Sequence, residues 1–345
     1  MRGKADTQVT MLTLITADQL VPGDHPIRQI KPIVDKVLIE LSPAFNRMYA
    51  ETGRPSIPPE HLLKACLLIA LYSVRSERQF CERLHYDLLF KWFLDLNIID
   101  PAFDASTFSK NKERLLENAV ARKFLVVVLE EARQRKLLSE DHFTVDGTLL
   151  EAWASLKSFG PKDGNDAHQS TTDPKALLAK KGYGKEAKLC FTGHVLMENR
   201  NGMVVDVTLT QATGTAERES ALDMIKGAHG SRRVTLGADK GYDTQDFITT
   251  CRDMNVTPHV ARRKTSKLDG RTTRHTGYQT SQRIRKRVEE IFGWVKTVGG
   301  GRKLRYRGVE RNQLWWELTA AAYNLLRMAK LAQRVTDKGE LCPIS

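Results

Sequence analysis

Three acidic residues stand where their side chains could hold metal ions: Asp146, Asp239 and Glu289. Asp146 falls within an alternating stretch that predicts a strand, and Asp239 ends another, although Asp is depleted in strands. Three close carboxylates repel one another unless a cation neutralises them. Oxygen ligands without His or Cys suit Mg²⁺ or Mn²⁺, and two such ions about 4 Å apart can activate a water or a 3′-hydroxyl at a phosphodiester. Taken singly, Asp146 is equally consistent with a turn beside Gly147, and Asp239 with a helix cap.

The third acid lies on a predicted helix, residues 281–297, whose apolar residues recur at helical spacing. With Arg285 set at zero on a helical wheel, Gln282, Glu289 and Lys296 fall at about 60°, 40° and 20°, at the edge of the apolar stripe. Glu290 points away at about 140°. The wheel therefore favours Glu289 as the site carboxylate. A solvated surface helix with an Arg285–Glu289 pair is the alternative.

Positive charge is concentrated around the third acid. The chain carries a net charge of +13, and residues 252–311 hold seventeen Lys/Arg against five Asp/Glu, a net of +12. A block this basic repels itself unless it faces a polyanion, so nucleic acid is the default partner, with a basic surface kept for solubility as the alternative. We predict that Arg285 and Lys296 clamp phosphates near the reacting bond. Non-specific backbone affinity is expected from Arg262, Arg263, Lys264, Arg283, Arg287, Arg302, Lys303, Arg305 and Arg307.

The predicted elements that position these residues change in type near residue 139. Residues 1–138 read as an all-α domain for DNA binding or dimerisation, in which residues 106–114 could present Lys110, Lys112 and Arg114 in a helix-turn-helix. Residues 139–311 read as β-β-β-α-β-α-β followed by the helix with Glu289, which implies a mixed five-stranded sheet flanked by helices, with a mobile loop at 155–187. Asp243 is expected to cap a helix there. Residues 312–345 are expected to form a C-terminal helix and tail docked on that domain.

Composition excludes several classes of protein. The longest apolar run, residues 62–74, contains Lys64 and is too short to span a bilayer. The first 20 residues lack the continuous apolar core of a signal peptide. Five cysteines, odd in number and without a CxxC pair, indicate neither a zinc site nor a disulfide framework, so we expect a reducing cytoplasm.

Taken together, these blocks resemble a known family. VDGTLLEAWAS, TGHVLMENRNGMVVD, LGADKGYD and KRVEEIFGWVKTVGG, together with a helical segment that begins at RPSIPPEHLL, are similar to the blocks of bacterial insertion-sequence transposases of the DDE type, in the insertion-sequence-four/five superfamily. The resemblance implies a ribonuclease-H-like core with Asp146, Asp239 and Glu289 as metal-binding triad. The family signature Tyr-x2-Arg-x3-Glu-x6-Lys fits Arg285, Glu289 and Lys296, with Gln282 in the tyrosine place, where an amide can still hydrogen-bond a phosphate.

The implied activity is metal-dependent cleavage and strand transfer at the terminal inverted repeats of the protein's own element. The partners expected are double-stranded DNA and a second copy of the chain in a synapsed dimer, with two Mg²⁺ or Mn²⁺ ions per site, acting on the nucleoid of a bacterial cytoplasm. A catalytically silent DNA-binding derivative and a nuclease without strand transfer are the alternatives. Trp294 is expected at a DNA or subunit contact or in a second core layer, and Trp153, Trp315 and Trp316 in packing.

Overall fold

A computed structural model describes residues 16–49, 56–162, 165–182, 184–266 and 268–338. Two predictions fall on residues outside these ranges. One is the lack of a signal peptide, which concerns the first 15 residues, and the other concerns Cys342. Among the described helices, none is both long enough and apolar enough to cross a membrane.

The N-terminal region is helical, as the sequence predicts. Local signals set its helix starts: His25 Nδ1 accepts the N–H of Ile27, Ser76 accepts that of Gln79, and Asp104 that of Thr107. The region contains α1 (Ala17–Leu20), α2 (Pro26–Asn46), α3 (Pro59–Leu71), α4 (Glu77–Leu84), α5 (Leu88–Phe93), α6 (Ala105–Glu117) and α7 (Val120–Gln134).

One basic residue of the expected helix-turn-helix is not available to DNA. Lys112 is buried, forms an ion pair with Glu77, and lies 4.0 Å from the ring centre of Tyr306. Lys110 and Arg114 on the same helix are exposed. Lys112 therefore joins α4 and α6 to the segment before the C-terminal helix.

The second region is built on one mixed sheet. Its strands are β1 (His142–Glu151), β4 (Leu177–Ala179), β5 (Lys188–Glu198), β6 (Val204–Gln211), β7 (Val234–Ala238) and β8 (Val256–Val260). They pair in the order β4-β5-β1-β7-β8, and β6 pairs with β5. β1 is antiparallel to β5 and parallel to β7. The expected α/β class and helix-flanked mixed sheet are confirmed, but the sheet has six strands instead of five.

The sixth strand comes from the segment that was expected to be a mobile loop. Residues 155–187 contain a short 3-10 turn at Leu156–Ser158, the hairpin of β2 (Phe159–Lys162) and β3 (Asn165–Ser170), and β4 at the sheet edge. The segment is rich in Gly, Lys and polar residues and lacks a clear alternation of apolar side chains. Backbone pairing to β5, which no local pattern reveals, gives β4 its strand conformation.

Helices cover both faces of the sheet. Phe143 and Val145 of β1 pack with α8 (Ala216–His229) and α9 (Gln245–Asp253) on one face. The other face packs against α12 (Val288–Thr297) and α13 (Val309–Lys338). Thr244, not Asp243, caps α9, and the Asp243 carboxylate instead accepts the N–H of Arg263 and the hydroxyl of Ser266.

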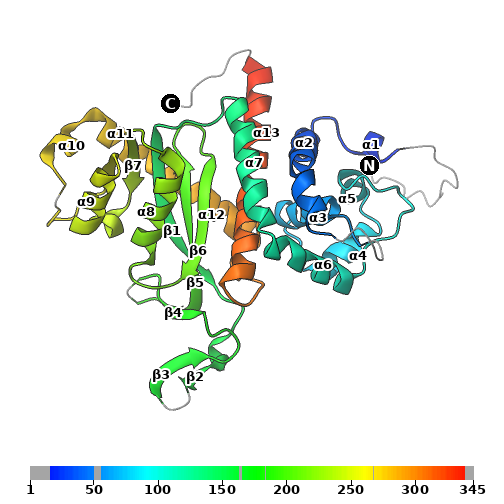
Figure 1. Cartoon of the computed structure of the whole chain (residues 1–345), viewed down its shortest axis with the longest axis horizontal. Helices are drawn as coiled ribbons and strands as arrows, with labels where there is room; N and C mark the ends of the chain where they lie inside the picture. Colours follow the sequence, from blue (N-terminus) through cyan, green and yellow to red (C-terminus); the bar gives the residue numbers. More distant parts are fainter. Residues whose placement is uncertain (1–15, 50–55, 163–164, 183, 267, 339–345) are drawn as a thin grey trace, which may run out of the picture.

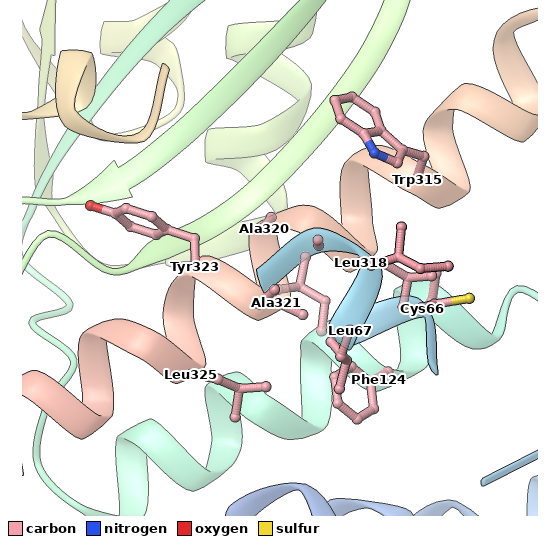
Figure 2. Close-up of a cluster of buried hydrophobic side chains, with 14 of the residues drawn as sticks. Cys66, Leu67, Phe124, Trp315, Leu318, Ala320, Ala321, Tyr323 and Leu325 are labelled. Atoms are coloured by element: carbon pink, nitrogen blue, oxygen red, sulfur yellow. The ribbon is translucent and has the colours of Figure 1, made fainter. Parts of the chain in front are cut away.

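The C-terminal helix connects the two regions. α13 contacts β6 on one side and α2, α3 and α7 on the other, so it does more than dock on the sheet domain (Figure 1). Figure 2 shows the shared core, in which Leu67 and Phe124 of the N-terminal helices gather around Leu318 and Ala321 of α13. Burial of one continuous apolar cluster makes the two regions a single packed unit.

The tryptophans divide between core and surface. Trp315 and Trp316 are buried, as expected, and Trp294 packs edge-on to Tyr323 with ring centres 5.7 Å apart in a second core layer. The packing role expected for Trp153 is wrong, because 53% of this residue is exposed. Lys303 lies 5.9 Å from its ring centre.

Candidate functional site

Two strands bring the first two acids together. β1 and β7 are parallel neighbours whose last printed pair is Thr144 and Gly237, and Asp146 and Asp239 each lie two residues further along the chain. Asp239 directly follows the last residue of β7, at the carboxyl edge of the parallel strands. Both aspartates therefore lie just beyond the paired part of β1 and β7, and the charge of Asp239 acts on the Asp146 carboxyl, whose pKa it raises.

The surroundings of Asp146 favour the protonated form of its carboxyl. Burial, together with the charges of Asp239 and Glu217, raises the pKa of its carboxyl to about 7, while the Gly147 N–H donates to Oδ1 at 2.8 Å. Asp239 accepts the N–H of Gly241 at 2.6 Å through Oδ1 and caps the short turn Lys240–Tyr242. Each aspartate thus has one anchored oxygen, and a second that no described residue binds.

A third acid at this edge, Glu217, was not predicted. It lies in the first turn of α8, and its Oε1 is 3.0 Å from the place that a Cβ on Gly147 would occupy. Burial, and then the charge of Asp239, raises the pKa of Glu217. No local pattern distinguishes Glu217 from other helix-start acids, because only the docking of α8 on β1 brings it here. A Cβ at Gly147 would press on that carboxylate, and the Glu217 side chain would have to shift to admit it.

A buried hydroxyl adjoins the acids. Tyr242 is completely buried, and its Oη has no hydrogen-bond partner among the described residues. Burial raises its pKa well above the ordinary value, and the charges of Glu217, Asp146 and Asp239 act in the same direction. Buried hydroxyls are normally hydrogen-bonded, so Tyr242 Oη is an unsatisfied polar atom among the described residues.

The helix that carries Glu289 is less regular than the sequence predicts. α11 (Thr276–Ile284) is followed by a 3-10 turn at Arg285–Arg287 and then α12. Glu289 is exposed and is not among the charges that shift the pKa of Asp146. The neighbouring Glu290, also exposed, pairs with Arg327 at 3.1 Å. Among the described residues, no three His, Cys, Asp or Glu side chains are arranged to hold one ion, so the structure leaves Glu289 apart from the two aspartates.

Contacts made by the residues on either side of Glu289 nevertheless limit where it lies along β1. Arg285 precedes Glu289 and packs close to Gly237: its Cβ is 3.5 Å from the position that a Cβ on Gly237 would occupy. Gly237 in turn pairs with Thr144 of β1. Lys296, after Glu289, donates through Nζ to Thr148 Oγ1 at 2.5 Å. Thr144, Asp146 and Thr148 share one face of the strand, because side chains alternate. The helical segment therefore runs along β1 with Glu289 between two cations that flank Asp146.

Family comparison identifies the protein. Residues 139–325, more than half of the chain, match the family model "Transposase DDE domain", and residues 15–114 match "Transposase domain (DUF772)". The chain belongs to the DDE transposase family.

Solved structures of transposases are similar to this one. A piggyBac transposase synaptic complex with hairpin DNA aligns over 93% of this chain and 77% of that chain, with 10% identity and a TM-score of 0.46. The Mos1 strand transfer complex aligns over 85% and 82% respectively, with 13% identity and a TM-score of 0.22.

The donor atoms of the acids of this transposase, though not arranged around one ion, are of the kind that a hard divalent cation takes, and the family's chemistry depends on such a cation. The side chains at the edge offer only oxygen donors, with no His or Cys ligand, which suits Mg²⁺ or Mn²⁺. The charge of Asp239 raises the pKa of both Asp146 and Glu217, and the opposing charges of Arg285 and Arg218 do not cancel the rise that burial begins. A bound cation would add positive charge there.

The predicted phosphate-binding residues of the transposase differ in availability. Gln282 donates through Nε2 to the carbonyl of His259 at 2.5 Å and accepts from Arg285 Nε at 3.0 Å, so it positions Arg285. Arg287 donates to the carbonyls of Asn199 and Arg200, both at 2.8 Å. The remaining predicted residues that stay exposed are Arg262, Arg263, Lys264, Arg283, Arg302, Lys303 and Arg307.

Two of the predicted cations are tied into the fold. Arg263, although exposed, donates through Nε to the carbonyl of Lys240 at 2.7 Å, next to Asp239. Arg305 is partly buried, and burial lowers its pKa. Its guanidinium lies against Gly300, where a side chain would collide with it. The Arg263 contact therefore supports the turn that follows Asp239, whereas Arg305 supports the loop at Gly300.

Proposed function

We propose that this transposase binds the terminal inverted repeats of its own insertion sequence as a synapsed dimer, cleaves the DNA there, and joins the freed 3′-hydroxyl to target DNA. The observation that supports the proposal is that Asp146 and Asp239 each lie two residues beyond the last pair of the parallel strands β1 and β7, within a chain of the DDE family. The expected place of action, the nucleoid in a bacterial cytoplasm, is part of the proposal.

In this proposal Asp146 and Asp239 hold two Mg²⁺ or Mn²⁺ ions, and Glu289 completes the set. Bound ions supply activation of the attacking oxygen and stabilisation of the leaving oxygen. The free oxygens of the two aspartates are the ligands, because their other oxygens are anchored by backbone N–H groups. Glu289 is exposed on a helix whose flanking residues already lie on β1, so its carboxylate has no competing partner among the described residues.

Arg285 and Lys296 position the DNA. Gln282 binds only Nε of Arg285, which leaves the terminal guanidinium nitrogens for a phosphate near the reacting bond. Burial lowers the pKa of Lys296, yet the amine keeps N–H donors beyond the one given to Thr148. Both side chains therefore orient the scissile region without reading its sequence.

Cleavage of DNA that carries the element's ends tests the proposal. We expect strand cleavage with Mg²⁺ or Mn²⁺, none with EDTA, and joined products when pre-cleaved ends are incubated with plasmid. Asp146→Ala should abolish both reactions and keep end binding. Cleavage without joining would identify a nuclease instead, and unchanged activity of Asp146→Ala would refute the assignment of the site.

Glu289 requires its own comparison. Glu289→Gln should abolish cleavage. Glu290→Gln, at the neighbouring position on the same helix, should remove the ion pair with Arg327 and leave cleavage unchanged. The reverse result would assign the role to Glu290.

A further inference from the structure

A basic site lies at the amino ends of the parallel strands, whereas Asp239 lies at the carboxyl end of β7. A cavity of about 890 Å³ opens where β1, β7 and β8 begin, and helices α10 (Gly270–Arg274) and α11 close its other side. Figure 1 shows α10 and α11 beside β7, at the end of the molecule away from the N-terminal helices. Thr235 on the cavity wall is four residues before Asp239, which corresponds to about 13 Å along an extended strand.

The cavity continues into a second hollow. This neighbour, of about 490 Å³, shares Arg233, Thr257, Arg271 and Thr272 with the first. Together the two form one groove along the amino ends of the parallel strands, which we call the arginine groove.

Four arginines line the arginine groove: Arg200, Arg233, Arg252 and Arg271. All four are exposed, and their guanidinium groups form no ion pair or hydrogen bond with another residue that the structure describes. The adjacent Arg232 differs, because it pairs with Glu140 at 2.6 Å. The lining includes two acids, Asp141 and Asp269. The Asp269 carboxylate already accepts the backbone N–H of Arg271 at the start of α10.

The remaining polar groups of the groove also suit an anion. Threonine hydroxyls from β7, β8 and α10 line it, and the first turn of the nine-residue helix α11 opens into it with its positive dipole end. His259, 4% exposed on the groove wall, is held by Ser281 at 2.7 Å. Guanidinium forks, hydroxyls and backbone N–H groups are the usual donors to phosphodiester oxygens.

We propose that the arginine groove binds the phosphodiester backbone of DNA, at a contact separate from the DNA held at the acid edge. The inference rests on the proposed function, since the partner is the transposase's own DNA. A duplex repeats every 3.4 Å per base pair, so a contact about 13 Å from the acids lies roughly four base pairs or more from the reacting bond. Such a contact fixes the register of the DNA on the catalytic domain.

Salt dependence of DNA binding tests the groove. The variant Arg233→Gln/Arg271→Gln removes the two arginines that both hollows share. If each contacts one phosphate, the slope of log K against log salt falls in magnitude by about 1.8, so the loss of affinity between 50 and 200 mM salt becomes about 12-fold smaller. The matched control Arg232→Gln/Arg135→Gln removes the same charge from arginines that are paired with Glu140 and Glu131.

The outcomes separate the groove from the proposed function. A changed slope in the groove variant alone supports the proposal, and equal slopes in groove variant and control overturn it. Adenosine monophosphate provides a further arm: protection against thermal unfolding that depends on Arg233 and Arg271, with an unchanged DNA slope, would make the groove a nucleotide site and overturn DNA binding there. Cleavage by the unmodified transposase with Mg²⁺ is measured in parallel, because its absence would contradict the proposed function and leave the slope comparison valid.

Discussion

Replacing Asp146 by Asn should stabilise the metal-free protein at alkaline pH while it abolishes cleavage. Burial and the nearby charges of Asp239 and Glu217 raise the pKa of the Asp146 carboxyl from 3.8 to about 7 in the folded state. Between these two pH values the unfolded chain has lost the proton and the folded chain retains it, so the folded state becomes less stable as pH rises. Asn carries no such penalty, and its amide oxygen can still accept the Gly147 N–H.

The magnitude follows from the size of the shift. Each pKa unit corresponds to about 1.4 kcal/mol, so the full penalty above pH 7 reaches about 4 kcal/mol as an upper bound. Integrated over the window, the advantage of the Asn variant grows by roughly 2.5 kcal/mol between pH 5 and pH 8. Saturating Mg²⁺ should reduce this advantage, because a cation that binds the folded wild type neutralises the acids and adds binding free energy.

Urea denaturation with EDTA at pH 5 and pH 8 measures the effect, and the same titrations are repeated with Mg²⁺. Asp223→Asn, at an exposed position of α8, is the control, and its stability should stay within about 0.5 kcal/mol of wild type at both pH values. An advantage of Asp146→Asn that is the same at pH 5 and pH 8 would refute the argument that burial and the neighbouring acids raise the pKa of Asp146.

Three further changes test the fold that positions the site. Lys112→Met leaves the partly buried Glu77 carboxylate without its cation and should lower the free energy of unfolding by about 3 kcal/mol in urea titrations. Gly193→Ala places a Cβ 3.1 Å from the Trp316 ring and should cost about 1–3 kcal/mol by the same measurement. Burial lowers the pKa of His194 to about 4, so stability should fall as pH drops from 6.5 towards 4, by up to about 3 kcal/mol, and His194→Gln should remove that dependence.

Each of these changes has a control or a contradicting result. Arg311→Ala breaks an exposed pair with Glu113 and should cost less than about 1 kcal/mol, so equal losses for this variant and Lys112→Met would contradict the role of burial. A Gly193→Ala variant as stable as wild type would show that the neighbouring side chains move apart without cost. A pH profile that His194→Gln leaves unchanged would assign the acid sensitivity to other groups.

The sequence by itself determined the elements and the chemical class of the site. Period-two alternation placed Asp146 in a strand and Asp239 at a strand end, and both assignments are confirmed. Ser76 and Asp104 cap their helices through local hydrogen bonds, and Gly202 supplies the φ of +70° in the turn after Asn201. These features depend on atoms within about four residues of one another, so they can be derived without the rest of the chain.

Tertiary structure alone decided which side chains meet. Glu217 reaches the acid edge because α8 docks on β1, and Arg287 is bound by carbonyls of the β5–β6 turn, neither of which follows from neighbouring residues. Glu289 has the helical phase that the wheel predicts for a core-edge residue and is nevertheless exposed. α13 is buried between the two regions because apolar side chains from distant segments pack around it. β4 forms because its backbone groups pair with those of β5. Periodicity fixes the face of an element, whereas the partner of that face is set by the packing of the whole chain.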